Sequence, residues 1–414
     1  MKNLKSEFLN EINSRGFIYQ ASDLQKLDST MKKKSIVGYI GFDSTSDSLH
    51  IGSLVQLMLL FWMEYYGHKP IALMGGGTTL VGDPSGKDKT RKILSEKQIE
   101  KNISNIKKIF KNFINFNKNA KIINNHKWLS KLNYIDFLRD VGPKVTINRM
   151  LTFESVKSRL DREQPLSFLE FNYMLLQAYD FLYLNMNHEC ILQMGGSDQW
   201  GNIVSGIDLI KKTKNKEAFA ITSPLITSSD GSKMGKTAEG AVWLDKDKFN
   251  DYDFFQYWRN VEDSDVVKFL KLFTKLPISE INKLSKLKDK EINDAKKILS
   301  YEITKICRGE KAAKKALEIS SNIFDKKLLD NRITSKEIKR NDIILNKFNV
   351  IDALEKLNLV KSRSDAKRLI KSKGIKINNI IYSEENFSLK NYEKDKSEIK
   401  IAVGKKKIGL IKIK

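Results

Sequence analysis

The sequence predicts an α/β protein with three parts: a parallel-sheet domain, an all-helical domain and a small α+β module. Between residues 35 and 227, short apolar runs alternate with segments of helical periodicity, and such alternation builds a parallel sheet with helices on both faces. Residues 245–327 show helical patterns and no clear strand, and from about residue 347 two helices precede short β-like pieces. The predicted domains are residues 1–228, 229–327 and 347–414, with a polar linker at residues 328–346.

Five segments of the first domain are predicted to be buried strands, because each is short, apolar and rich in Ile and Val. They are SIVGYIGF, KPIALMGGG, AKII, CILQMGG and FAITSPLIT, and several end in glycine. Helices between the strands are predicted from apolar residues that recur at a helical spacing. Examples are Ile103, Ile106, Phe110 and Phe113, and then Ile203, Ile207 and Ile210.

The composition is that of a globular protein with a polyanionic partner. The chain has 414 residues, 41% of them hydrophobic, and a net charge of +24, which excludes wholesale disorder and favours nucleic acid over an anionic membrane. Most basic residues are Lys, so part of the excess is compositional background. Residues 349–414, however, hold 17 Lys and Arg against 8 Asp and Glu. The concentrated charge therefore marks this module as the part expected to bind a polyanion.

Cysteine usage and hydropathy predict a cytoplasmic protein. Cys190 and Cys307 lie 117 residues apart, which is neither a disulfide framework nor a metal-site spacing. The N-terminal segment has no apolar core of the kind found in signal peptides. The longest apolar run, residues 57–62, is far shorter than the ~20 residues that span a bilayer. We therefore expect no membrane segment and no metal held by protein ligands.

The segment YIGFDSTSDSLHIGS, from Tyr39 to Ser53, has the pattern of a nucleotide site. A strand ends at Gly41, a turn of Asp, Ser and Thr follows, and then an apolar helix begins. The free N–H groups at a helix start bind anions, and Thr45 and His50 can donate hydrogen bonds to phosphate oxygens. An ordinary strand–turn–helix with polar caps is the alternative interpretation.

A second candidate site is KMGKT, from Lys233 to Thr237, inside the Gly- and Ser-rich stretch SSDGSKMGKTAEG. Two lysines flank a glycine on a loop that can close over a triphosphate and neutralise the charge that develops during reaction. A solvated, Lys-rich surface loop is the alternative.

Together, in this order and 183 residues apart, HIGS and KMGKT resemble the HIGH and KMSKS motifs of class I aminoacyl-tRNA synthetases. GDPSGK, NYMLLQAYDF and GGSDQWGN narrow the resemblance to the bacterial-type tyrosyl-tRNA synthetases, in the tyrosine/tryptophan branch. The resemblance covers the whole chain. It implies a Rossmann-like catalytic domain with an inserted connective and dimerisation region, a KMSKS-type loop with an α-helical domain, and an S-four-like RNA-binding domain.

One helix face carries the specificity residues that this family would need. Tyr173, Gln177 and Asp180 are spaced i, i+4 and i+7, so they share one face of a helix, and a phenol, an amide and a carboxylate together suit the recognition of a small polar molecule. Packing for Tyr173 and capping for Asp180 are the alternatives. The resemblance implies that tyrosine binds at Tyr39, Asp83, Tyr173, Gln177, Asp180 and Gln199.

The resemblance also implies an ATP pocket and a set of catalytic residues. The implied ATP-binding residues are Gly41, Asp43, His50, Gly52, Ser53, Gly195, Asp198, Lys236 and Thr237. The implied catalytic residues are Thr45, His50, Lys87, Arg91, Lys233 and Lys236. Two positions depart from the family motifs: Ser53 replaces the last His of HIGH with a shorter side chain, and Gly235 replaces the first Ser of KMSKS.

The basic stretch VKSRSDAKRLIKSKGIKINN resembles the S-four-like RNA-binding module, and the terminal GKKKIGLIKIK would add a second strip that contacts phosphates. A solubilising helix in a Lys-rich protein is the alternative. The candidate tRNA-binding residues are Arg363, Lys367, Arg368, Lys371, Lys373, Lys405, Lys406 and Lys407.

The expected function is ligation of tyrosine to its tRNA, through a tyrosyl-adenylate formed from L-tyrosine and ATP. Mg²⁺ is expected to arrive with ATP and to be held mainly by phosphates. A homodimer is expected from the family. Two alternatives stay open: a tryptophanyl-tRNA synthetase, which shares the fold, and a non-catalytic RNA-binding protein on a synthetase scaffold.

Overall fold

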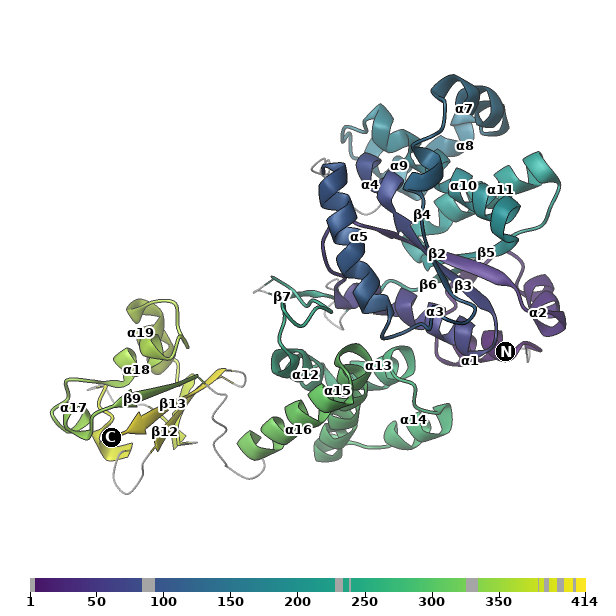
Figure 1. Ribbon diagram of the computed structural model, residues 1–414. Helices are drawn as coiled ribbons and strands as arrows, with labels where there is room; N and C mark the ends of the chain where they lie inside the picture. Colours follow the sequence, from purple (N-terminus) through teal and green to yellow (C-terminus); the bar gives the residue numbers. More distant parts are fainter. Residues whose placement is uncertain are drawn as a thin grey trace. The chain divides into compact units, whose positions relative to one another are not determined.

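The computed structural model describes residues 4–83, 94–227, 234–237, 240–324, 334–378, 380–382, 387–392, 398–404 and 407–414. The chain forms two compact units, Met1–Lys314 and Lys315–Lys414 (Figure 1).

The first unit contains a six-stranded sheet in the order β1-β6-β5-β2-β3-β4. Its strands are β1 (Gln20–Ala21), β2 (Val37–Asp43), β3 (Lys69–Gly75), β4 (Lys121–Asn124), β5 (Cys190–Gly196) and β6 (Phe219–Ser223). All neighbours from β6 to β4 pair in parallel, and only β1 runs antiparallel to β6. The five predicted strands are thus β2 to β6, which confirms the predicted α/β fold class.

Helices surround this sheet, as the alternating pattern predicts (Figure 1). Those of the sheet-bearing part are α1 (Glu7–Ser14), α2 (Leu24–Lys33), α3 (Leu54–Tyr65), α4 (Gly76–Val81), α5 (Glu96–Phe110), α6 (His126–Leu129), α7 (Tyr134–Val141), α8 (Ile147–Leu151), α9 (Glu154–Leu160), α10 (Phe168–His188) and α11 (Trp200–Lys214). A short hairpin of β7 (Lys236–Thr237) and β8 (Gly240–Ala241) comes next along the chain. The helices that follow are α12 (Asp251–Arg259), α13 (Val266–Phe273), α14 (Ile278–Leu284), α15 (Ile292–Arg308) and α16 (Glu310–Phe324).

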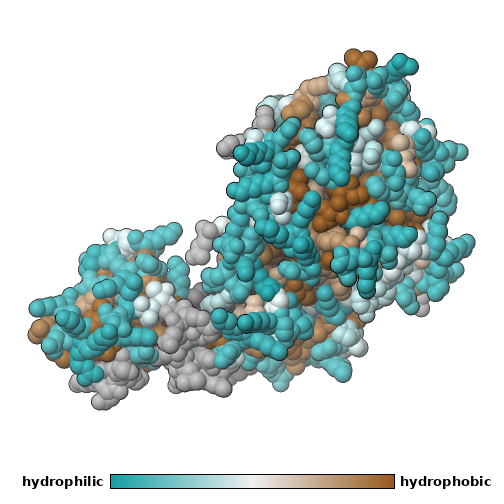
Figure 2. All heavy atoms as spheres, viewed as in Figure 1, coloured by the Kyte–Doolittle hydropathy of each residue, from teal (hydrophilic) through white to brown (hydrophobic). Residues whose placement is uncertain are grey.

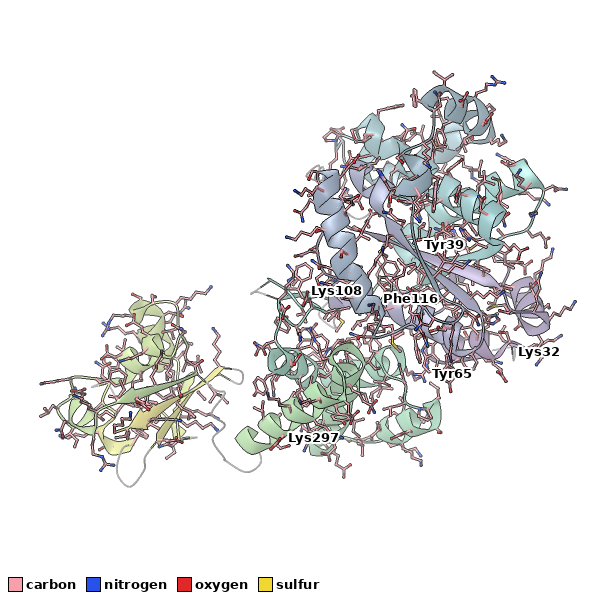
Figure 3. The ribbon with its side chains drawn as sticks, viewed as in Figure 1. Lys32, Tyr39, Tyr65, Lys108, Phe116 and Lys297 are labelled. Atoms are coloured by element: carbon pink, nitrogen blue, oxygen red, sulfur yellow. The ribbon has the colours of Figure 1, made fainter. Side chains whose placement is uncertain are left out.

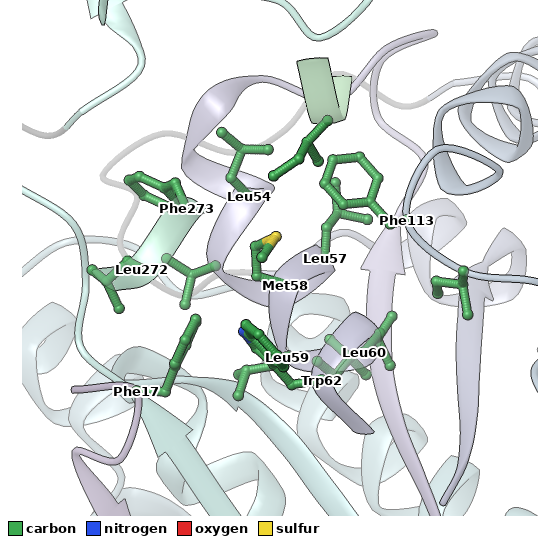
Figure 4. Close-up of a cluster of buried hydrophobic side chains, with 14 of the residues drawn as sticks. Phe17, Leu54, Leu57, Met58, Leu59, Leu60, Trp62, Phe113, Leu272 and Phe273 are labelled. Carbon is green, nitrogen blue, oxygen red and sulfur yellow. The ribbon is translucent and has the colours of Figure 1, made fainter. Parts of the chain in front are cut away.

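Helix α3 lies in the middle of the core of the first unit. Its residues are apolar on nearly every side, and Leu57, Leu59 and Leu60 are fully buried. Figure 4 shows this helix among Phe17, Leu272 and other apolar side chains from distant parts of the chain. Sheet and helical residues belong to one hydrophobic cluster that extends from Phe8 to Cys307. A helix buried on several sides needs partners on several sides, and α3 obtains them from the sheet and from α13.

The second unit is an α+β module with a five-stranded sheet in the order β11-β10-β12-β13-β9. Its elements are β9 (Thr334–Ile338), α17 (Arg340–Ile344), α18 (Val350–Lys356), α19 (Arg363–Lys371), β10 (Ile375–Ile377), β11 (Ile380–Ile381), β12 (Glu398–Val403) and β13 (Lys407–Ile413). A separate hydrophobic core lies between the helices and the sheet.

The prediction of a linker at residues 328–346 is wrong for the described residues, 334–346. Residues 334–346 contain β9, which pairs in parallel with β13, and α17. β9 reads TSKEI and leaves three of its five residues exposed, which is the polar composition of an edge strand. This polar composition is also typical of a linker, which is why the sequence predicted one. Residues 328–333 of the predicted linker lie outside the described part of the chain.

No helix in the described ranges is both long enough and apolar enough to cross a bilayer.

Candidate active site

A cavity of about 330 Å³ opens where β2 and β5 lie side by side. β3 lies beyond β2 and β6 beyond β5, so the connections leave this point in opposite directions. In a parallel α/β sheet, ligands bind in the crevice at such a switch point, outside the carboxyl ends of the strands. The predicted site residues that line the cavity are Tyr39, Gly41, Asp43, Gly52, Ser53, Asp83, Tyr173, Gln177, Asp180, Gly195, Asp198 and Gln199.

Helix α10 presents the predicted face of Tyr173, Gln177 and Asp180 to this cavity. The helix begins with a capping box in which Ser167 and Glu170 satisfy each other's backbone N–H groups. Glu170 also accepts a hydrogen bond from the buried guanidinium of Arg159, at 2.7 Å. The start of the helix that carries the site is therefore fixed by three polar partners.

Amide side chains connect one wall of the cavity. Asn202 Nδ2 donates to Gln177 Oε1 (3.1 Å) and to Gln199 Oε1 (3.2 Å). Gln199 Nε2 in turn donates to Asp83 Oδ2 (3.0 Å). Gln199 has both its oxygen and its nitrogen engaged, and Gln177 has its oxygen engaged, so these bonds fix the orientation of the polar groups in this wall. This polar wall can hold an ammonium group.

Two residues that line the cavity, Tyr39 and Asp180, are almost completely buried. Figure 3 shows Tyr39 within the sheet of the first unit. Its hydroxyl has no hydrogen-bond partner among the described residues. A buried hydroxyl without a partner is costly, so a ligand that supplies one would be bound selectively here. Burial, together with the nearby Asp180, raises the pKa of the Tyr39 phenol well above its usual value.

The carboxylate of Asp180 is held by two side chains that the sequence did not single out. Asn125 Nδ2 donates to Asp180 Oδ2 (2.8 Å), and Trp128 Nε1 donates to Asp180 Oδ1 (2.7 Å). Trp128 also stacks on Tyr183, with ring centroids 4.1 Å apart. Burial raises the pKa of Asp180 to about 7, against the opposing effect of these two hydrogen bonds. This carboxyl group therefore changes charge near neutral pH.

Sequence reasoning missed other polar residues that line the cavity: Gln56, Thr78, Asn125 and Gln193. Asn125 follows directly after the end of β4, so the rule that ligands meet the carboxyl ends of strands would have pointed to it. Trp128 is not on the lining of the cavity, and no local signal marks its contact with Asp180.

The two signature motifs meet in the structure. His50 Nδ1 accepts a hydrogen bond from the N–H of Gly52 (3.0 Å). A Cβ atom on Gly52 would lie 2.6 Å from His50 Cε1, and one on Gly235 would lie 3.1 Å from His50 Nδ1. Gly235 also has φ +105°, a conformation that residues with a side chain rarely adopt. Glycine at this departure from the family motif is therefore required by the backbone and by its contact with His50.

Some predicted residues lie outside the cavity lining, and others cannot be placed. Thr45 and His50 are exposed and do not line the cavity. The backbones of Lys236 and Thr237 form β7. The predictions for Lys87, Arg91, Lys233, Lys405 and Lys406, and for the side chains of Lys236 and Thr237, fall outside the described residues. Within the described ranges, no group of three His, Cys, Asp or Glu side chains is arranged to hold a metal ion.

In the second unit, most of the candidate RNA-binding cations are exposed. These are Lys367, Arg368, Lys371, Lys373 and Lys407. Arg368 pairs with Asp365 of its own helix (2.6 Å). Arg363 is exposed as well, and its guanidinium pairs with Asp352 (2.8 Å) and Glu355 (3.0 Å) of α18. Its charge is therefore partly used to join α18 to α19.

Comparison with known proteins places the chain in a family. Residues 31–325 match the model of the tRNA synthetases class I (W and Y). The chain is 50% identical over 409 residues to a tyrosine–tRNA ligase of Xanthobacter autotrophicus, with 99% of this chain and 98% of the relative covered. It is 48% identical over 410 residues to that of Rickettsia prowazekii, with 98% and 100% covered.

Solved structures of synthetases from this branch have a similar fold. A C-terminally truncated mitochondrial tyrosyl-tRNA synthetase of Aspergillus nidulans superposes with a TM-score of 0.70 at 29% identity, covering 77% of this chain and 94% of that chain. A tryptophanyl-tRNA synthetase of Plasmodium falciparum, at 16% identity and a TM-score of 0.54, covers 76% of this chain and 88% of its own and shares the fold alone. The chain belongs to the class I tRNA synthetases of the tryptophan and tyrosine branch, and within that branch to the tyrosine–tRNA ligase family.

Proposed function

We propose that this chain activates L-tyrosine with ATP and transfers it to the 3′-terminal adenosine of tRNA(Tyr). The observation that carries the proposal is that Tyr39 and Asp180, both buried, line the same cavity. The hydroxyl of Tyr39 has no partner among the described residues, and Asp180 is an ionisable acceptor that lines the same cavity. A substrate phenol would satisfy both groups. Phenylalanine would leave the buried Tyr39 hydroxyl unpaired and would give Asp180 no further donor, which is the physical basis of its rejection.

In the first step, the tyrosine carboxylate attacks the α-phosphate of ATP and pyrophosphate leaves. In the second, a ribose hydroxyl of the terminal adenosine attacks the adenylate, and AMP leaves. The enzyme contributes no covalent nucleophile: it positions the reactants and stabilises the charge on the departing pyrophosphate. We assign that stabilisation to Thr45, His50, Lys87, Arg91, Lys233 and Lys236. Mg²⁺ enters with ATP and is held mainly by its phosphates.

The substrates divide the cavity between them. Asp83, Tyr173 and Gln177 hold the tyrosine ammonium group, and Gln199 lies near the reacting carboxylate. Gly41, Gly52 and Gly195 leave room for the nucleotide, with Asp43, Ser53 and Asp198 beside it. In support, all of these residues line one cavity.

A homodimer is the proposed assembly, built on an apolar surface of α7, α8 and α10. The exposed side chains on this surface are Tyr134, Ile135, Leu138, Ile147, Leu151, Phe168 and Leu169. Figure 2 shows hydrophobic side chains exposed over the region of α7. Exposed apolar patches of this kind mark interaction sites. Sedimentation velocity should give twice the chain mass, and Ile147→Glu should shift the protein towards monomer.

The second unit is the proposed anchor for tRNA, since the exposed cations of α19 and β13 can contact phosphates. The proposed reaction belongs to translation, so we place the enzyme in the cytoplasm.

Amino-acid-dependent exchange of pyrophosphate into ATP tests the proposed function. Exchange driven by tyrosine, and not by tryptophan or phenylalanine, supports it. Exchange driven by tryptophan would identify the other branch of the family. An absence of exchange with every amino acid would indicate the non-catalytic alternative.

A further inference from the structure

The segment that follows the KMGKT motif is held at both ends, and the residue that holds its far end lies in the helical part of the fold. This segment, residues 242–249, joins the β7–β8 hairpin to α12. Val242 is also bonded to the hairpin, because its N–H donates to Gly235 O (3.1 Å).

Near its start, the segment pairs with the backbone of the HIGS motif. The N–H of Ile51 donates to Val242 O (3.0 Å), and the N–H of Leu244 donates to Leu49 O (2.8 Å). The ring of Trp243 meets that of His50 edge to face, with centroids 6.4 Å apart. The segment therefore sets the distance between the two motifs.

Side-chain contacts hold the rest of the 242–249 segment in place. Lys248 pairs with Asp47 at 2.7 Å, in the turn that precedes HIGS. The guanidinium of Arg308, the last residue of α15, donates to Trp243 O and to Phe249 O, both at 2.9 Å. One buried cation thus spans almost the full length of the segment.

We infer that Arg308 is a positioning residue for adenylate formation: it holds the 242–249 segment so that the KMGKT loop meets the HIGS motif in a reactive arrangement. This inference rests on the proposed function, in which both motifs act on ATP. Arg308 does not line the tyrosine cavity. Its loss should therefore slow the step that involves ATP and leave tyrosine binding unchanged.

The side chain suits this role. It is buried, with 3% of its surface exposed, and its charged plane lies 4.8 Å from the ring centroid of Phe254. Its Nε lies 3.8 Å from the carboxylate of Asp251. Both bonds come from Nη2. The guanidinium plane fixes the directions of its two N–H bonds, whereas the ammonium group of Lys rotates freely on a shorter side chain. Arg308→Lys should therefore restore part of the function that Arg308→Met removes.

Arg15 provides a matched control. It is equally buried and donates to three backbone carbonyls of the same helical region, those of Lys271, Thr274 and Leu276. It also stacks on Trp62, 4.3 Å from the ring centroid. No contact joins it to the 242–249 segment among the hydrogen bonds of the described residues. Arg15→Met should lower the melting temperature about as much as Arg308→Met.

The test measures single-turnover adenylate formation, tyrosine affinity by equilibrium dialysis, and melting temperature for wild type and the three variants. In Arg308→Met we expect the rate constant at saturating ATP to fall between about 10- and 100-fold, with the tyrosine Kd within about twofold of wild type. The rate constant of Arg308→Lys should lie between those of the wild type and of Arg308→Met. Arg15→Met should keep the wild-type rate.

Three results would overturn the inference: an unchanged rate in Arg308→Met, an equal loss of rate in Arg15→Met, or a tyrosine Kd that rises in parallel with the loss of rate. If Arg308→Met does not fold, the rate of Arg308→Lys alone tests the inference. A wild-type rate of adenylate formation in Arg308→Lys would contradict the need for a guanidinium at this position. Failure of the wild-type protein to form tyrosyl-adenylate would instead refute the proposed function.

Discussion

Replacing Trp128 with Phe should move the pH at which tyrosine binds. The indole N–H of Trp128 is one of two donors to Asp180, at 2.7 Å. Phe keeps a six-membered aromatic ring to stack on Tyr183 and removes the donor, together with the five-membered ring that carries it. Because that hydrogen bond stabilises the charged form of the carboxyl group, its loss raises the pKa of Asp180 above the present value of about 7.

The size of the shift follows from the strength of a hydrogen bond to a charged group. Such a bond contributes about 1.5–3 kcal/mol, and one pKa unit corresponds to about 1.4 kcal/mol, so the expected shift is about one to two units. At pH 7 the carboxyl group of the wild type is half ionised, whereas that of Trp128→Phe would be only about 1–10% ionised. If tyrosine needs the ionised acceptor, its affinity at pH 7 should fall roughly 5- to 50-fold.

The assay is tyrosine affinity by equilibrium dialysis between pH 5.5 and 8.5. Affinity for the wild type should rise with pH through about 7 and then level off, because the pKa of Asp180 in the free protein is raised to that value. Affinity for Trp128→Phe should still be rising at pH 8.5. Tyr183→Phe, which keeps the stacked ring, should retain the wild-type midpoint. A common midpoint for wild type and Trp128→Phe would refute the reasoning.

Three further predictions concern the signature loop and the second unit. Lys236→Ala should slow adenylate formation strongly and change tyrosine binding little, because its contact should exist mainly in the transition state; an unchanged single-turnover rate would remove Lys236 from the mechanism. Gly235→Ser should lower both the melting temperature and the adenylation rate, since a side chain at φ +105° costs about 1 kcal/mol or more and approaches His50; a wild-type rate would show that the loop tolerates it. Deleting residues 325–414 should spare tyrosine-dependent exchange and abolish tRNA charging. Deleting only residues 347–414 should also leave β9 without its partner β13, and the exposed strand should cause aggregation that gel filtration detects. Charging that survives either deletion would contradict the role assigned to the second unit.

Local pattern was sufficient for much of the fold. The five central strands could be predicted because a strand buried on both faces must be apolar along its whole length. The face of Tyr173, Gln177 and Asp180 could be predicted because helical periodicity alone brings them together. β9 was missed because an edge strand is polar, and only its pairing with β13 shows that it is a strand.

The sequence by itself determined the family, the α/β fold class and the helix face that lines the cavity, because each of these depends on residues close together in the chain. Only the tertiary structure decided how those residues are held. Asn125 and Trp128 reach Asp180 from more than 50 positions away, and Arg308 reaches Trp243 from 65 positions away. Contacts at such separations leave no periodic signal, since they are made only when the sheet and its helices bring distant segments together.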